Sequence, residues 1–161
     1  MPKPKKKFMR QAIELALRGV EEGAAPFGAV IVKDGEVVAS AHNTVKRTNN
    51  PTQHAEMRAI QQACEVLERH KLTGCVLYTT CVPCTMCIGA IYWADLDAVF
   101  YGTGAEEARS NGFMYLQSYY DRDKKKRNAE LGMRQFMADE CDSMMEAAVK
   151  KVETKLSLQI V

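Results

Sequence analysis

The chain has 161 residues, 47% of them hydrophobic and 26% charged, so its composition is that of one globular domain and not of a disordered or fibrous protein. Its formal net charge is +2, and the first ten residues carry five basic side chains and no acidic one, which leaves −3 for the rest. This distribution argues against a dedicated nucleic-acid binder. We expect residues 1–8 to form a flexible basic arm and residues 9–161 a single domain.

No stretch of the sequence has the run of about 18 apolar residues that a membrane span needs. No apolar segment with a small-residue cleavage site follows the charged N-terminus, so we expect a cytoplasmic protein without membrane contact. In that reducing compartment six cysteines are not expected to form a disulfide framework. Cys81, Cys84 and Cys87 follow one another at intervals of three, a spacing that favours a metal or catalytic role.

The first expected elements are a helix and a β-hairpin. Apolar residues at spacings of three and four predict a helix over about 8–22, which ends at Gly23. The apolar run 28–33 predicts a buried strand. Asp34-Gly35 then predicts a type I′ turn, in which both central residues have positive φ, before a return strand over 36–42.

Helices and strands alternate along the rest of the chain. The expected elements are, in order, a polar loop (43–50), a helix (52–70), a strand (75–79), a short helix (83–93), a strand (97–102), a fifth strand (131–137) and a last helix (138–155). Such alternation predicts an α/β layer fold with the sheet covered on both faces. The tight hairpin makes that sheet mixed.

Two short motifs carry the chemistry. The first is His54-Ala55-Glu56, and the second is Pro83-Cys84-Thr85-Met86-Cys87. Thiolate sulfur and imidazole nitrogen are the donors that zinc prefers, and catalytic zinc sites offer three protein ligands and an open position. Both motifs fall in the first turn of a predicted helix, where side chains tilt toward the N-terminus and can converge. The pattern predicts a Zn²⁺ site made by His54, Cys84 and Cys87, with Glu56 beside it.

Other interpretations of these residues exist. A Cys-x-x-Cys pair can be a redox pair or half of a four-ligand structural zinc site. Cys81 and Cys84 form an equally spaced rival pair, although Cys81 is explained most simply as a strand-end residue that packs under the site. The joint pattern His-x-Glu followed by Pro-Cys-x-x-Cys is typical of zinc deaminases that act on nucleobases. It favours the catalytic interpretation.

With these motifs the sequence resembles the cytidine deaminase superfamily, and within it the bacterial guanine deaminase branch. The similarity spans roughly residues 9–113. Besides the two zinc motifs, the matching segments are Pro26-Phe27-Gly28-Ala29-Val30-Ile31-Val32, Asp34-Gly35, Asn43, Pro51-Thr52 and Gly89-Ala90-Ile91-Tyr92-Trp93-Ala94. The resemblance implies a three-layer α/β/α sandwich with a five-stranded mixed sheet, and a homodimer.

The resemblance also implies roles for single residues. It assigns zinc to the predicted ligands and the proton shuttle to Glu56. It further implies that Phe27 stacks on the purine ring, Asn43 hydrogen-bonds the ring, the Ala55 backbone contacts a ring carbonyl and Trp93 walls the pocket. Each has a plainer interpretation: Phe27 and Trp93 can be core residues, and Asn43 can bond its own loop.

The sequence departs from the guanine branch after the fourth strand. The branch has Gly-Phe-Asp-Asp there, with one catalytic aspartate, whereas this chain has Gly112-Phe113-Met114-Tyr115. Val82 stands where the branch commonly has Glu, and the chain ends in Ile160-Val161 instead of near a pocket aromatic. Either the substrate ring lacks the N–H pattern of guanine, or a carboxylate such as Glu106 or Asp121 replaces the missing acid.

These observations predict a zinc-dependent hydrolase that removes an exocyclic amine from a nucleobase or a related amino-heterocycle. The predicted reaction converts guanine to xanthine and ammonia, with a small-molecule heterocyclic amine as the partner. Three alternatives stay open: a cytosine deaminase, a tRNA wobble adenosine deaminase, and a non-enzymatic zinc module.

Overall fold

A computed structural model of the chain describes residues 2–113, 137–138, 140 and 143. The chain divides into two compact units, residues 1–118 and 119–161, and the nine elements that follow belong to the first. They are α1 (Lys6–Glu21), β1 (Gly28–Lys33), β2 (Glu36–His42), α2 (Val45–Thr48), α3 (Ala55–Val66), β3 (Cys75–Cys81), α4 (Thr85–Ala94), β4 (Ala98–Thr103) and α5 (Ala105–Ser110).

The described strands form one mixed sheet in the order β2-β1-β3-β4. β1 is antiparallel to both β2 and β3, while β3 and β4 are parallel. The turn between β1 and β2 has positive φ at both central residues, 52° at Asp34 and 85° at Gly35, as a type I′ turn requires. The predicted hairpin and the mixed sheet are therefore confirmed.

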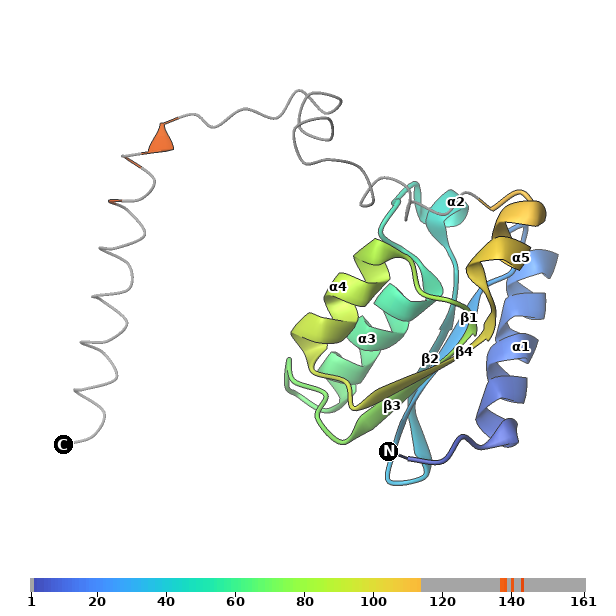
Figure 1. The fold of residues 1–161 in the computed structure, drawn as a ribbon, viewed down its shortest axis with the longest axis horizontal. Coiled ribbons are helices and arrows are strands. Elements are labelled where there is room, and N and C mark those ends of the chain that lie inside the picture. Colours follow the sequence, from blue (N-terminus) through green and yellow to red (C-terminus); the bar gives the residue numbers. More distant parts are fainter. Residues whose placement is uncertain (1, 114–136, 139, 141–142, 144–161) are drawn as a thin grey trace. The chain divides into compact units, whose positions relative to one another are not determined.

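Helices cover both faces of this sheet (Figure 1). Successive side chains of a strand point to opposite faces, so Val30 and Val32 pack with Phe8 of α1 while Ala29 and Ile31 join the other cluster. That second cluster lies between the sheet and the helices α3 and α4, and it consists largely of small side chains, among them Ala39, Ala41, Ala55, Ala59, Ala63, Ala90 and Ala94. Small side chains let these two helices approach the sheet closely.

The strand directions place the N-termini of α3 and α4 at the same edge of the sheet. Since β2 and β3 both run antiparallel to β1, they run in the same direction and end at the same edge. After the end of β2 the chain passes through the short helix α2 to α3, and α4 follows the end of β3. The two helices that carry the zinc motifs therefore start close together, although about thirty residues separate them in the sequence.

Helix boundaries are where the prediction from sequence is least accurate. α1 begins at Lys6, which makes the extended part of the basic arm shorter than expected. α3 begins at Ala55 instead of residue 52 because the Asn50 side chain accepts a hydrogen bond from the Thr52 N–H (2.9 Å), which sets up a turn before the helix. The short helix α2 lies within the expected loop 43–50.

The described residues contain four strands, not the five expected. The predicted fifth strand (131–137) and last helix (138–155) lie, apart from single residues, outside the described part of the chain. The count of five strands and the single domain 9–161 thus stay predictions. None of the described helices combines the length and the apolar character that crossing a membrane requires.

Gly28 lies where β1 passes closest to α1, and we predict that Gly28→Ala destabilises the fold. A Cβ at this position would overlap the main-chain oxygen of Ala12, and backbone atoms cannot move aside as a flexible side chain can. We expect the free energy of unfolding, measured by urea denaturation, to fall by about 1–3 kcal/mol. Gly89→Ala is the matched control, because a Cβ there meets nothing within 4 Å. A Gly28→Ala protein as stable as this control would contradict the prediction.

Candidate metal centre and active site

Two helix N-termini bring the three expected donor side chains together. His54 is the N-cap of α3 and Cys84 the N-cap of α4, and both have extended backbones (φ −66°, ψ 156° and φ −70°, ψ 169°). Cys87 follows three residues after Cys84, so the two sulfurs lie on one face of α4. The N-cap conformation lets His54 face the same point, which is the convergence that the two motifs predict.

The spacing of the donor atoms fits a tetrahedral zinc ion. The Cys84 Sγ lies 3.6 Å from the Cys87 Sγ, and the His54 Nδ1 lies 3.7 Å from each sulfur. With bonds of about 2.3 Å to sulfur and 2.0 Å to nitrogen, tetrahedral angles put two sulfurs about 3.8 Å apart and a sulfur and a nitrogen about 3.5 Å apart. The observed separations agree with these values to within 0.2 Å or so. The three residues could therefore hold Zn²⁺ without rearrangement.

Cys81 does not belong to this group of donors. It ends β3 and is buried, and within the described part of the chain the group that could hold a metal consists of His54, Cys84 and Cys87. Three protein donors leave the fourth tetrahedral position to water or substrate. This is the arrangement of a catalytic zinc site, whereas a structural site closes with four protein ligands.

Glu56 lies beside the donor group in an apolar environment. Its side chain is buried, with one oxygen accepting a hydrogen bond from the Thr79 hydroxyl (3.0 Å) and the other lying 3.7 Å from the Cys87 Sγ. Burial raises the pKa of the Glu56 carboxyl, because the charged form loses its hydration, although hydrogen bonds from its own backbone and from Thr79 act in the opposite direction. A carboxyl group in such a setting is suited to accept and return a proton.

The two thiols polarise each other. A hydrogen bond from the Cys87 thiol lowers the pKa of Cys84 to about 4, and His54 contributes in the same direction. The same hydrogen bond, together with burial, raises the pKa of Cys87. The hydrogen bond to Cys84 also raises the pKa of His54. The Cys84 sulfur is thus suited to bind a metal ion as a thiolate.

A cavity of about 310 Å³ opens next to the donor group. This volume is at the lower end of the range for small-molecule sites. Phe27 and Phe113 form one wall with an edge-to-face ring contact (centroids 4.9 Å apart, 71° between planes). The other lining residues come from the donor group and from the segments around it: Ala25, Asn43, Val45, Lys46, His54, Glu56, Cys81, Val82, Cys84, Ala108 and Gly112. The expected residues Phe27, Asn43, His54, Glu56 and Cys84 thus share one cavity.

The amide of Asn43 has a defined orientation. Its Oδ1 accepts a hydrogen bond from the Val45 N–H (3.2 Å), and a backbone N–H can only donate, so the oxygen faces the loop. Its Nδ2 group points the other way. Asn43 is 4% exposed and lines the cavity, so its amide would meet a ligand as a hydrogen-bond donor.

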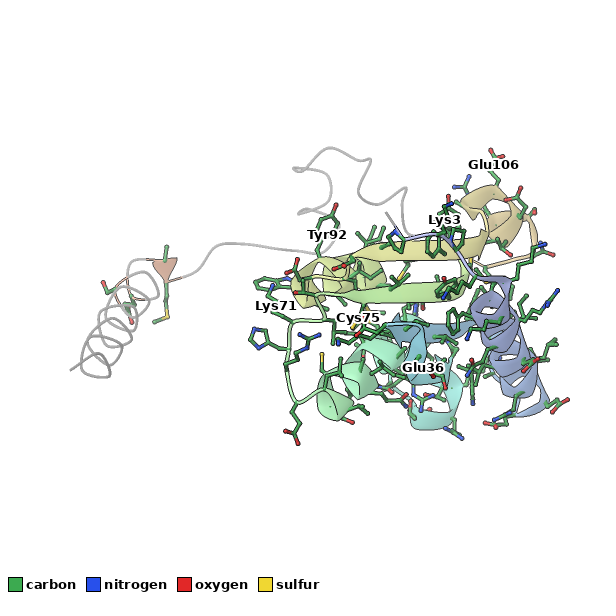
Figure 2. The ribbon with its side chains drawn as sticks, turned by 90° about the horizontal axis from the view of Figure 1, so that it is seen from below. Lys3, Glu36, Lys71, Cys75, Tyr92 and Glu106 are labelled. Atoms are coloured by element: carbon green, nitrogen blue, oxygen red, sulfur yellow. The ribbon has the colours of Figure 1, made fainter. Side chains whose placement is uncertain are left out.

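Two expected residues do not reach the cavity. Trp93 is 82% exposed and is not among the lining residues, because it follows Cys84 by nine positions, about 13 Å along α4. Its neighbour Tyr92 also points outward (Figure 2). Glu106, a candidate for the missing acid, is exposed on α5 and points into solvent (Figure 2). The second candidate, Asp121, lies outside the described residues.

Two residues of the site, Thr79 and Lys46, were not predicted from the sequence. Thr79 is a fully buried hydroxyl in the middle of β3, and a polar residue inside an otherwise buried strand is the signal that could have singled it out. Lys46 lines the cavity mouth from α2, in the segment expected to be a loop. Ala55 is the buried first residue of α3, as its motif predicts, and a role for its backbone stays a prediction.

Comparisons with known proteins agree with this geometry. Residues 2–103 match the family described as the cytidine and deoxycytidylate deaminase zinc-binding region. A guanine deaminase of Bacillus subtilis (strain 168) is 49% identical over 118 residues, which are 73% of this chain and 76% of that protein. A tRNA-specific adenosine deaminase of Aquifex aeolicus is 43% identical over 97 residues, 60% of this chain and 64% of that protein.

The fold also matches a solved structure. An X-ray structure of guanine deaminase from Bacillus subtilis superimposes with a TM-score of 0.83 and 40% sequence identity, covering 92% of this chain and 95% of that one. Residues 2–103, which match the zinc-binding region of the family, include both motifs of this chain. The similarity extends beyond the zinc-binding region to most of the chain.

The donor geometry makes a direct prediction about metal content. We expect about one zinc ion per chain, measured by inductively coupled plasma mass spectrometry, and a loss of most of it in Cys87→Ala because two donors cannot complete the site. Cys81→Ala is the control and is expected to keep its zinc, since Cys81 lies outside the donor group. Loss of zinc from the Cys81 variant alone would favour the rival cysteine pair.

Proposed function

The chain belongs to the family of cytidine and deoxycytidylate deaminases, and from this premise we propose that it is a zinc-dependent hydrolytic deaminase that converts guanine to xanthine and ammonia. The observation that carries the proposal is the buried carboxyl of Glu56 next to a three-donor metal group, at the end of a small cavity. Water, an exocyclic amine and a proton carrier can meet in such a site.

The positions of the residues support a role for each. We assign the metal to His54, Cys84 and Cys87. Zinc, when bound, supplies Lewis acidity and lowers the pKa of water toward about 7. Glu56 takes one proton from the attacking water and delivers it to a ring nitrogen. It then carries the second proton of the same water to the amine, which leaves as ammonia. Thr79 keeps one oxygen of Glu56 in place through its hydrogen bond.

The walls of the cavity suit a flat, polar ring. Phe27, which is in edge-to-face contact with Phe113, offers an aromatic ring on which a purine can stack. Asn43 presents an N–H donor, which pairs with acceptor atoms on the edge of a purine. The choice of guanine rests on the 49% identity to the Bacillus subtilis guanine deaminase and on the 0.83 TM-score of the solved structure.

A second candidate is deamination of adenosine in tRNA. The Aquifex aeolicus relative at 43% identity favours it, as does the basic N-terminal arm. The negative net charge of the remaining chain and the small volume of the cavity favour the free base.

We also infer a homodimer. Ile88, Tyr92 and Trp93 are exposed apolar side chains on α4, and the two aromatic ones are at least 80% exposed. Exposed patches of this kind usually mark contact surfaces. A partner subunit that covers α4 would give Trp93 a contact that it lacks among the described residues. We place this enzyme of free-base metabolism in the cytoplasm.

We predict that Glu56→Gln keeps its zinc and loses deaminase activity. The amide has nearly the same shape and leaves the metal donors unchanged, but it cannot accept a proton, so kcat should fall by about 10²–10⁴-fold. Ammonia release and zinc content are measured on the same preparation. Wild-type turnover by this variant would refute the proton-shuttle role.

A substrate panel tests the choice of base. Zinc-loaded protein is assayed for ammonia release with guanine, adenine, cytosine, their nucleosides, and a tRNA anticodon stem-loop that carries adenosine. We expect guanine to have the highest kcat/KM, because its carbonyl and ring nitrogens offer acceptors to the Asn43 amide. Preference for the stem-loop with a steep salt dependence would instead support the tRNA reaction.

A further inference from the structure

Asn43 is held from three directions. Its backbone N–H donates to the Phe27 carbonyl (3.0 Å), and its Oδ1 accepts from the Val45 N–H. Its carbonyl oxygen lies 2.9 Å from the Nδ1 of His42. Because a carbonyl can only accept, the Nδ1 must carry the proton in this hydrogen bond. Of these three contacts with Asn43, only the last is made by the side chain of another residue.

The His42 ring packs against Gly19 of α1. A Cβ on Gly19 would lie 2.9 Å from the Nδ1 and 3.1 Å from the Cγ of His42, so the glycine leaves room for the imidazole. Glycine is among the least favourable residues inside a helix, and the space for His42 gives this one a structural reason. The His42 side chain is largely buried, at 11% exposure.

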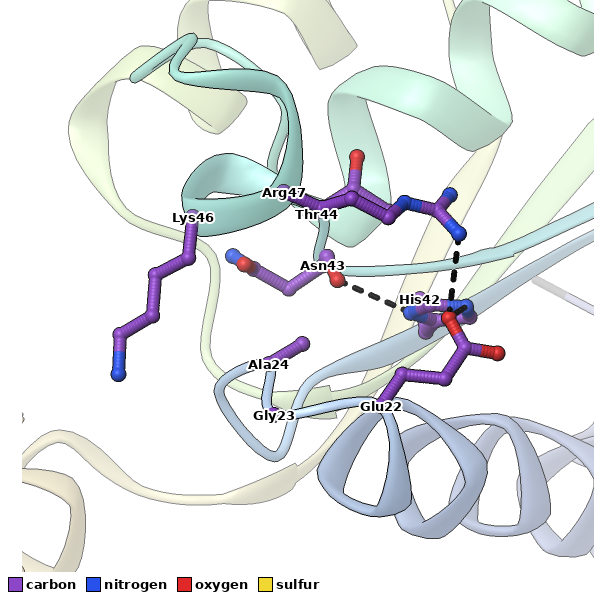
Figure 3. A pocket seen from close by; sticks show the side chains of 8 residues that line it. All are labelled: Glu22, Gly23, Ala24, His42, Asn43, Thr44, Lys46 and Arg47. Atoms are coloured by element: carbon purple, nitrogen blue, oxygen red, sulfur yellow. Dashed lines mark hydrogen bonds and ion pairs between the residues drawn. The ribbon is translucent and has the colours of Figure 1, made fainter.

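Glu22 faces the far side of the same ring. Its Oε2 lies 3.4 Å from the His42 Nε2 and 3.2 Å from the Nη1 of Arg47, as Figure 3 shows. Glu22 is the C-cap of α1, where the helix dipole disfavours a carboxylate, so its partners must compensate for that position. Arg58 of α3 holds the main chain of His42 by donating to its carbonyl oxygen (2.8 Å).

From this arrangement we propose that His42 is a positioning residue, which braces the Asn43 carbonyl and so sets the direction in which the Asn43 side chain enters the catalytic cavity. When the Nε2 also carries a proton, the Glu22 carboxylate pairs with it and holds the imidazole in the orientation that this contact needs. His42 does not line that cavity, so it acts on the substrate only through Asn43. The proposal rests on the proposed function and adds to it a chain of contacts from the end of α1 to the substrate.

The first test replaces the imidazole of His42 with another ring, so that no cavity is left beside α1. His42→Phe keeps an aromatic ring, slightly larger than imidazole, and removes both nitrogens. We expect KM for guanine to rise about tenfold, the effect of one weakened hydrogen bond. kcat should stay within about twofold, because an interaction made equally in ground and transition states affects KM alone. His42→Gln, which keeps an N–H donor, should restore part of the loss.

Substitutions in and next to α1 test the contacts that hold the His42 ring. Gly19→Ala pushes a Cβ against the imidazole while it improves helix propensity, so a raised KM in this variant cannot be explained by a weaker helix. Glu22→Gln should raise KM in the same direction. Glu21→Gln is the matched control, because Glu21 is exposed on the last turn of α1 and does not line the catalytic cavity.

A double-mutant cycle decides whether His42 acts through Asn43. In an Asn43→Ala background, His42→Phe should have no further effect on KM, because the side chain that it positions is gone. Additive effects would overturn the proposal. So would a His42→Phe variant that lowers the unfolding midpoint and kcat together while KM stays at the wild-type value, since that is the result of a purely structural role.

A structural readout separates this inference from the proposed function. If wild-type protein released ammonia from none of the bases, the proposed function would fail, and the positioning role would be decided by a crystal structure of His42→Phe. An Asn43 side chain turned out of the cavity would support it. An Asn43 side chain in the wild-type position would overturn it.

Discussion

The N-termini of α3 and α4 must meet at one point for this site to exist. The sheet imposes that meeting, because β2 and β3 are both antiparallel to β1 and end at the same edge. Small side chains such as Ala59 and Ala90 let both helices pack closely on the same face of the sheet. Three donor atoms 3.6–3.7 Å apart are the result, and their geometry is set by the core and not by flexible loops.

The same packing controls the chemistry of Glu56. As the second residue of α3 it is carried into the interior by the helix, and burial then raises the pKa of its carboxyl. The Thr79 hydroxyl satisfies one of its oxygens, so the cost of burying this polar group is reduced. Proton transfer and metal binding thus depend on one structural feature, the close approach of α3 to the sheet and to α4.

Local patterns in the sequence were enough to predict much of this. The His-x-Glu and Cys-x-x-Cys motifs report on single helix turns, and Asp34-Gly35 reports on one hairpin turn, so each could be recognised without knowing the fold. The exposure of Trp93 and the partners of His42 could not. The exposure of Trp93 depends on how α4 lies over the sheet. The contacts of His42 depend on Gly19 and Glu22, which are 23 and 20 residues away in the sequence.

X-ray absorption spectroscopy at the zinc edge of the purified protein is the most direct measurement of the donor set. We expect two sulfur neighbours at about 2.3 Å and two lighter neighbours, one of them an imidazole nitrogen, at about 2.0 Å. A first shell of three sulfurs and one nitrogen, or of four protein ligands of any kind, would contradict the three-ligand site.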